Sequence, residues 1–220
     1  MDFIYSPRPF LAEEKEQAIR SIIASAVPDR DFYVLVVGAV LLASCGIFLD
    51  SIPVLIASMI VAPLATPILG LGLGIAIRDK AVVMRSGAML LAAVAVSLAF
   101  AMMISSATGG MAVREIDRIF ISFIPNYFFD IAIALASGAI AAYGFIRPKV
   151  GSAMTGIGIA VSLMPPLVGT GIEWTFLHRD LAIAAGTVFL LNVCGILAAS
   201  SVVFSLFGFR RVYRRMKMNA

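Results

Sequence analysis

Residues 51–77 form an uncharged hydrophobic run, SIPVLIASMIVAPLATPILGLGLGIAI, with helix-breaking residues near its middle. A helix needs about 20 apolar residues to cross a hydrocarbon core of about 30 Å, so this run is long enough to span a membrane. Pro63 and Pro67 lack an N–H and clash with the preceding turn, which predicts a broken helix. The carbonyls expected to have weakened or missing helical hydrogen-bond partners are those of Ser58, Met59, Val61 and Pro63.

A break of this kind limits where the helix can lie. Hydrocarbon offers no hydrogen bonds, so the backbone at the break must face other protein groups or a water-filled cavity. Breaks in two halves of a chain form the solute and ion sites of many secondary transporters. The alternative is a kinked helix that only packs, since proline and glycine are both common in membrane helices.

The composition of the whole chain places it in a membrane. Of its 220 residues, 61% are hydrophobic and only 14% are charged, and the mean hydropathy is +1.01, which excludes a soluble globular domain. The first thirty residues have no apolar core, so we expect no cleaved signal peptide. The net charge of +4 reflects a basic C-terminal tail, so nucleic acid is not an expected partner. Cys45 and Cys194 fall in apolar segments and are expected to be packing residues.

The hydropathy pattern divides the chain into three parts. Residues 1–31 predict one amphipathic helix, with Pro9 in its first turn and Pro28 after its end, that lies on the membrane surface or against a neighbouring subunit. Residues 32–208 predict six transmembrane helices, and residues 209–220 predict a basic cytoplasmic tail. The expected spans are 32–49, 52–77, 81–105, 127–146, 150–172 and 181–207.

Basic residues are distributed unevenly among the predicted connections. Most lie in the N-terminal segment, in the second and fourth connections and in the tail, whereas the other connections hold only Arg114, Arg118 and Arg179. The positive-inside rule then places both termini in the cytoplasm, as an even number of spans requires. We therefore expect a multi-pass protein of the cell (inner) membrane.

The fifth span repeats the unusual pattern of the second, since Pro165 and Pro166 lie between glycines. Sliding the chain against itself by 99 positions aligns Asp31 with Asp130, Ala43 with Ala142, Pro67 with Pro166, Gly70 with Gly169 and Gly72 with Gly171. A two-residue insertion then aligns Arg78-Asp79 with Arg179-Asp180. Because each half has an odd number of spans, the halves must cross the membrane in opposite directions. The predicted fold is all-α, with inverted three-helix repeats at 31–106 and 127–207 and broken second and fifth helices.

Two polar residues inside predicted spans are candidates for a solute or ion pathway. Asp130 lies at the outer end of the fourth span, where it could bind a cation or proton, or act as a helix cap. Asn192 lies well inside the sixth span, where it could line a path or make an interhelical hydrogen bond. Hydroxyl groups near the breaks could satisfy freed carbonyls or touch a solute. The full predicted pathway is Ser58, Pro63, Thr66, Pro67, Gly70, Asp130, Ser162, Pro165, Pro166, Gly169 and Asn192.

Enzyme chemistry is not expected from this sequence. The lone histidine, His178, cannot build a metal site, and Trp174 beside it is typical of an interfacial anchor. The GLGLG segment lies inside a span and does not follow a strand, so it does not predict a phosphate-binding loop. We expect no catalytic residues, cofactor or metal.

The sequence resembles a family of bacterial and archaeal hydrophobic membrane proteins, the domain of unknown function 389 family. The matching segments are SIPVLIASMIVAPLATPILGLGLGIAI, IPNYFFDIAIALASGAIAA, GSAMTGIGIAVSLMPPLVGTGI and FLLNVCGILAAS, and together they cover roughly residues 31 to 207. The resemblance implies a multi-pass membrane fold and no established substrate. Many relatives carry an extra soluble N-terminal region, which this sequence does not show.

These observations favour a transporter or channel for a small solute or ion, with its site at the two proline breaks. The alternative is a non-transporting membrane scaffold or sensor in which the breaks serve only close packing. Small residues in the spans allow helices to approach closely, so we expect a homo-oligomer in the lipid bilayer.

Overall fold

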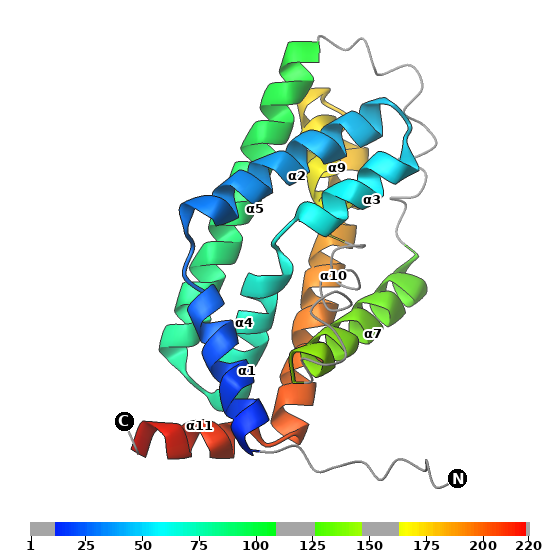
Figure 1. Ribbon diagram of the computed structural model, residues 1–220. Helices are drawn as coiled ribbons and strands as arrows, with labels where there is room; N and C mark the ends of the chain where they lie inside the picture. The colour runs from blue at the N-terminus through cyan, green and yellow to red at the C-terminus, as the bar shows by residue number, and fades with distance from the viewer. Residues whose placement is uncertain (1–11, 109–125, 147–162, 219–220) are drawn as a thin grey trace, which may run out of the picture.

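The computed structural model describes residues 12–108, 126–146 and 163–218, and these residues form helices and short turns (Figure 1). No strand occurs in these three ranges, so the all-α expectation is confirmed for them. The helices are α1 (Ala12–Ser25), α2 (Arg30–Phe48), α3 (Ile52–Val61), α4 (Ala65–Ile77), α5 (Lys80–Thr108), α7 (Tyr127–Ile146), α9 (Met164–Thr175), α10 (Arg179–Leu206) and α11 (Phe209–Met218).

Helices α3 and α4 are the two halves of the predicted broken span. They meet at an angle of 49° across residues 62–64, which confirms the break at Pro63. The expectation of a weakened or missing helical partner is wrong for the carbonyl of Ser58, whereas the carbonyl of Pro63 has no helical donor because residue 67 is proline. Ser58 O accepts the ordinary helical bond from the backbone N–H of Ala62 at 3.1 Å, because Ala62 precedes the proline. Pro63 O accepts from the backbone N–H of Thr66 at 3.3 Å, because the chain makes a tight turn between the two helices.

Four described helices are long and apolar enough to cross a membrane: α2, α5, α7 and α10. The bent pair α3 and α4 brings the number to five if it counts as one span. Most of the predicted fifth span, 150–172, lies outside the described residues, which include only its last part in α9. These helices have the length and composition of a membrane protein.

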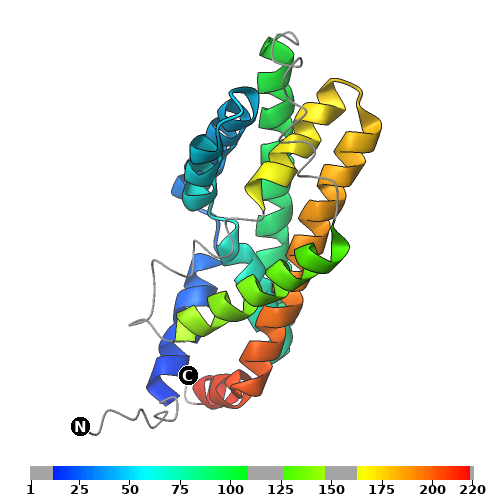
Figure 2. The same ribbon diagram turned by 90° about the vertical axis from the view of Figure 1, so that its right-hand side faces the viewer.

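The two shorter helices α4 and α9 pack between the two longest ones. Each of them contacts both α5 and α10, and α2 packs against α3, α5 and α9. Helix α5 rises and α10 descends in Figure 1, and α4 and α9 likewise run in opposite directions, as the second view confirms (Figure 2). Buried Leu69, Leu73, Val168 and Ile172 of α4 and α9 form part of the core between the long helices.

Two pairs of helices in the two halves begin 99 positions apart. Ala65 begins α4 and Met164 begins α9, whereas Lys80 begins α5 and Arg179 begins α10. The two-residue insertion expected at Arg78 is therefore wrong for the helix boundaries. The turn between α4 and α5 covers residues 78–79 and that between α9 and α10 covers residues 176–178, because α9 ends one residue earlier than the offset from α4 would give.

Helices α1 and α11 lie together at the end of the bundle where α4 ends and α5 begins (Figure 1). The apolar stripe of α1 was expected to meet the membrane surface or a neighbouring subunit, but it packs inside the same chain, against α4, α11 and α7. Ala18, Ile19 and Ile22 are almost completely buried there. Helix α11 occupies most of the segment expected to be a basic tail and lies across this end of the bundle.

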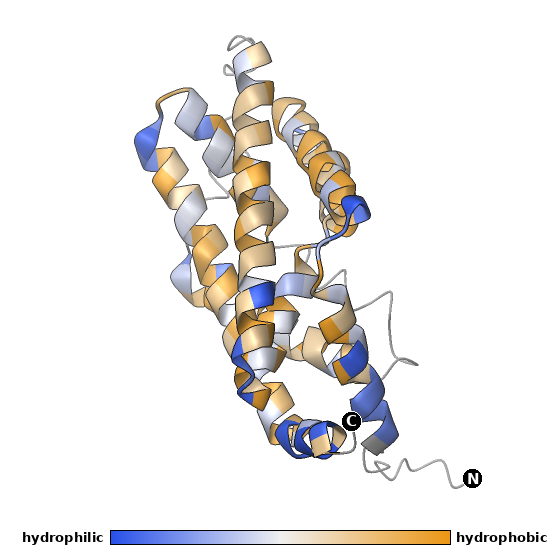
Figure 3. Ribbon diagram, turned by 90° about the vertical axis from the view of Figure 1, so that its left-hand side faces the viewer, coloured by the Kyte–Doolittle hydropathy of each residue, from blue (hydrophilic) through white to orange (hydrophobic). Residues whose placement is uncertain are grey.

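Hydropathy separates the ends of the bundle from its body. Figure 3 shows hydrophilic residues concentrated in α1, α11 and the turns, and hydrophobic residues along the bodies of the long helices. Leu91 of α5 and Leu190 of α10 are more than half exposed although both lie in the middle of apolar helices. An apolar surface of this kind is suited to contact with lipid chains.

Candidate functional site

The break between α3 and α4 is lined by small and hydroxyl-bearing residues. Ser58 is completely buried in α3, and its Oγ donates a hydrogen bond to Leu55 O at 2.7 Å. Thr66 is half-buried in the first turn of α4, and Pro67 behind it is buried. Gly70 lies one turn further, where an added Cβ would collide with the Oγ of Ser86. The hydroxyl of Ser58 therefore serves its own helix, whereas Thr66 has a partly open position.

The segment before the second predicted break lies outside the described residues, so the structure describes only the start of α9 there. Pro165 and Pro166 lie in the first turn of α9, where a missing N–H leaves no helical hydrogen bond unmade, and both are buried. Gly169 is buried in the next turn, and Thr170 Oγ1 donates to Pro166 O at 2.7 Å. The predicted pathway residue Ser162 lies outside the described residues.

Asp130 lies in the first turn of α7, where its charge favourably meets the positive end of the helix. Its backbone N–H donates to Asn126 O at 2.9 Å, so Asp130 is inside the helix and is not its cap residue. The carboxylate is half-buried, and its Oδ2 is buried without a hydrogen-bond partner among the described residues. This oxygen is an acceptor to which a proton or a cation could bind.

Asn192 lies in α10 and only 3% of its surface is exposed. Helix α10 packs against α7, which carries Asp130, and against α4 and α9, which follow the two breaks. Helix α3 also contacts α9, so the helices next to the two breaks are neighbours. The structure thus gathers α4, α7 and α9, which carry most of the predicted pathway residues, around α10.

Helices α7 and α10 cross with almost no space between their backbones. A Cβ added at Gly138 would lie 2.5 Å from Ile196 O, and one added at Gly195 would lie 2.5 Å from the Cβ of Ala134. Only glycine fits at these two positions, because the nearest atoms belong to a helix backbone or to a Cβ that cannot move away. This close crossing fixes the position of Asp130 relative to α10.

An ion cluster at the α4–α5 turn was missed by the sequence analysis. Asp79 Oδ2 accepts hydrogen bonds from Tyr213 Oη at 2.7 Å and Lys217 Nζ at 3.0 Å, and its Oδ1 accepts from the backbone N–H groups of Ala81 and Val82. The bonds from Tyr213 and Lys217 lower the pKa of Asp79 to about 2. Tyr213 and Lys217 are four residues apart on α11, and this spacing was the available signal that they share one face.

A second pair joins the ends of α9 and α10. The Nδ1 of His178 lies 2.7 Å from Oε2 of Glu173, whose side chain is almost fully buried, whereas that of His178 is about half exposed. The sequence analysis named His178 only as a lone histidine and did not pair it with an acid. Among the described residues, no group of three or more His, Cys, Asp or Glu side chains could hold a metal ion.

The remaining residues named from sequence occupy ordinary positions. Cys45 and Cys194 are both free thiols, and Cys194 is exposed on α10. Trp174 is 53% exposed near the end of α9, close to the Glu173 and His178 pair in sequence.

Comparison with known proteins gives a family and no activity. Over 202 residues the chain is 29% identical to an uncharacterized protein of Methanocaldococcus jannaschii, in an alignment that covers 89% of this chain and 62% of that relative. The chain thus spans less than two thirds of the relative's length. No solved structure matches it. The family model described as a domain of unknown function, DUF389, matches residues 59–198, and the chain belongs to this family.

Proposed function

We propose that this protein is a membrane transporter or channel for a small solute or ion. The observation that carries the proposal is the 49° bend between α3 and α4 inside a hydrophobic span. A broken helix at membrane depth is stable where its backbone faces protein or a water-filled cavity, and such breaks form the sites of many transporters.

The proposal includes two inverted three-helix repeats, of which the first contains α2 to α5 and the second contains α7 to α10. The offset of 99 positions between the first residues of α4 and α9, and between those of α5 and α10, supports this arrangement. The opposite directions of α4 and α9, and of α5 and α10, support it as well (Figure 1). In a repeat of this kind α9 is the partner of α4, so the site lies where the breaks before these two helices meet, beside α10.

In this arrangement Asp130 binds a proton or cation and Asn192 lines the route. The buried Oδ2 of Asp130 without a partner supports the first role, because an unpaired carboxylate oxygen gains free energy from a bound proton or cation. The basic residues of α1 and α11 gather at one end of the bundle, which supports a cytoplasmic position for that end. The exposed aromatic residues Tyr127, Phe128 and Phe129 on α7 face lipid or a second copy of the chain.

Thiol labelling tests for a water-filled path. Cys45 and Cys194 are replaced by Ala, a single cysteine is placed at Thr66, and the protein is reconstituted in vesicles. A membrane-impermeant thiol reagent is then added to either side. Leu177→Cys, in an exposed turn, and Lys80→Cys, at the opposite end of the bundle, are the positive controls. Ala93→Cys, fully buried in α5, is the dry control.

We expect the reagent to label Thr66→Cys and both positive controls but not Ala93→Cys. If Thr66→Cys reacts no faster than Ala93→Cys in folded protein, no water reaches the break, and a non-transporting scaffold or sensor is the better account. Proton flux into the vesicles gives a second measurement. Asp130→Asn should reduce it, whereas Asp180→Asn, on the exposed first turn of α10, should not.

A further inference from the structure

The end of the bundle that carries α11 has a positively charged pocket for which the proposed transport path has no use. This open pocket has a volume of about 400 Å³ and lies between the end of α4 and one face of α11. Four basic side chains line it: Arg78, Arg210, Arg214 and Lys217. The first comes from the α4–α5 turn and the other three come from α11, so residues distant in sequence meet here.

The backbone holds these cations in place. Arg78 follows the last residue of α4 with a left-handed backbone (φ 59°, ψ 44°), and its N–H and that of Asp79 bond to carbonyls of the last turn of α4. Arg210 and Arg214 are four residues apart and share one face of α11. The bonds from Tyr213 and Lys217 to Asp79 attach that face of α11 to the turn.

The pocket has more positive than negative charge. Its one acid, Asp79, is already paired with Lys217. The charges of the three guanidinium groups are therefore not balanced by an acid that lines the pocket. Within the described ranges of the chain, no carboxylate forms a salt bridge with any of the three. The Nε of Arg210 is buried and has no hydrogen-bond partner among the described residues. The nearby charges of Arg214 and Arg78 lower the pKa of Arg210, as expected for cations held close together.

Three guanidinium groups around one small pocket fit a particular class of ligand. Guanidinium forms paired hydrogen bonds with phosphate oxygens, and a phosphate has enough oxygens to bind several such groups. A bound phosphate would relieve the repulsion among the three arginines. We infer that this pocket binds a phosphate group, either the headgroup of an anionic phospholipid or a free phosphate compound.

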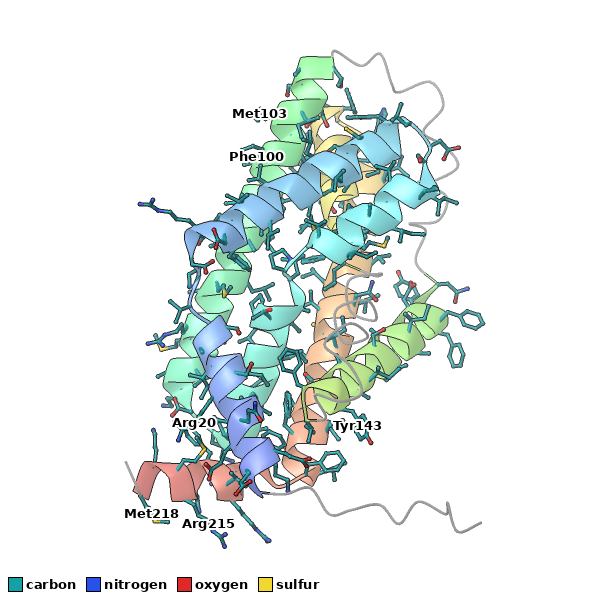
Figure 4. All side chains as sticks on the ribbon, in the orientation of Figure 1. Arg20, Phe100, Met103, Tyr143, Arg215 and Met218 are labelled. Atoms are coloured by element: carbon teal, nitrogen blue, oxygen red, sulfur yellow. The ribbon has the colours of Figure 1, made fainter. Side chains whose placement is uncertain are left out.

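Helix α11 offers its own control for this inference. Arg211 and Arg215 are exposed and do not line this pocket. Figure 4 shows Arg215 on the side of α11 that points away from the bundle. Arg210→Gln with Arg214→Gln, and Arg211→Gln with Arg215→Gln, therefore remove the same charge from the same helix but from different faces. The bonds that attach α11 to Asp79 are unchanged in both variants.

The experiment measures lipid bound to each protein. Wild type and the two double variants are placed in nanodiscs of phosphatidylcholine with or without phosphatidylglycerol, and the lipids retained after extraction are counted by native mass spectrometry. A second arm measures the melting temperature in detergent with and without glycerol 3-phosphate. Circular dichroism verifies that both variants keep the wild-type helix content.

We expect the Arg210 and Arg214 variant to retain about tenfold less phosphatidylglycerol than the Arg211 and Arg215 variant, a difference of about 1.4 kcal/mol in binding free energy, because it loses charge-assisted hydrogen bonds to the phosphate. Retention of the lipid alone identifies a headgroup site. A rise in melting temperature with glycerol 3-phosphate, lost in the Arg210 and Arg214 variant, identifies a site for a free phosphate compound. Equal losses in the two variants, or no response to either probe, would overturn the inference. All of these outcomes are independent of whether the protein transports a solute.

Discussion

Arg78 and Leu177 are 99 positions apart and have the same left-handed backbone, with φ of 59° and 63°. Each lies in a turn between two helices, and both turns have the same hydrogen bonds. Asp79 N–H donates to Gly74 O and His178 N–H donates to Glu173 O, both at 3.0 Å. Similar turns in both halves of the chain support the proposed repeat, because neither residue is one that favours a left-handed backbone.

The left-handed backbone at Leu177 predicts that glycine is the better residue there. Leu177 is 77% exposed, so removal of its side chain loses little packing. We expect Leu177→Gly to be more stable to unfolding than Leu177→Ala by about 1 kcal/mol, since only glycine adopts this backbone without strain. Thermal unfolding in detergent measures the difference. Equal stability of the two variants would show that the turn is not left-handed in solution.

Contacts between the halves also occur in pairs. Gly72 packs against Ser200, and Gly171 packs against Ala101. The offset of 99 positions relates Gly72 to Gly171 and also relates Ala101 to Ser200. A Cβ added at Gly171 would lie 2.8 Å from the Cβ of Ala101. We expect Gly72→Ala and Gly171→Ala each to lower the free energy of unfolding by about 1–3 kcal/mol, the usual cost of excess volume in a packed core.

Double variants test whether these contacts cause the expected loss of unfolding free energy. Gly72→Ala combined with Ser200→Gly, and Gly171→Ala combined with Ala101→Gly, should each be less destabilised than the sum of the two single changes. The measurement is the coupling free energy from the four unfolding midpoints of each cycle. In the structure α4 contacts α10 and α9 contacts α5. Strictly additive effects in both cycles would contradict these two contacts.

The parts of the fold that the sequence predicted are those with local causes. Pro63 interrupts its own helix through its missing N–H, so the position of the α3–α4 break could be predicted from the local sequence alone. The apolar stripe of α1 was also recognised, but its partner was not. The same stripe suits a membrane surface or a protein surface, and only the packing of Ile19 and Ile22 inside the chain decides between them.

The parts that were missed depend on distant residues. Asp79 and Lys217 are 138 positions apart, and no periodicity in the sequence indicates that the turn after α4 meets the C-terminal helix. The loss expected at Ser58 O was wrong for a local reason, because its helical donor, Ala62, precedes Pro63 and keeps its N–H. Pro63 O has no helical donor at Pro67 and bonds to the N–H of Thr66 in a tight turn. Proline identifies a break but does not determine how the backbone around it is satisfied.

The crossing of α7 and α10 predicts a contrast between two glycines. Gly138→Ala places a methyl group 2.5 Å from Ile196 O, so the helices must separate, and we expect a loss of about 1–3 kcal/mol of stability. Gly38 in α2 has no atom within 4 Å of an added Cβ. Gly38→Ala should be neutral or stabilising by up to about 1 kcal/mol, because alanine favours helix. Similar melting temperatures of the two variants would contradict the close crossing.

The bonds between Asp79 and α11 predict a dependence on pH. Hydrogen bonds from Tyr213 and Lys217 hold the pKa of Asp79 at about 2, below its ordinary value of 3.8. A carboxylate with a lowered pKa contributes its full stabilisation above pH 3.8 and loses it as the pH falls to about 2. We therefore expect Asp79→Asn to melt at a lower temperature than wild type at neutral pH, and this difference to shrink between about pH 4 and pH 2.

The control for this pH dependence is Asp180→Asn. Asp180 lies in the exposed first turn of α10, and it has no ion pair among the described residues. Its replacement should change the melting temperature little, since an exposed charge near a helix terminus contributes typically about 0.3–1 kcal/mol. A difference between wild type and Asp79→Asn that remains constant down to pH 2 would mean that the carboxylate charge does not hold α11 in place. Packing of α11 against α1 and α4 would then be sufficient to position it.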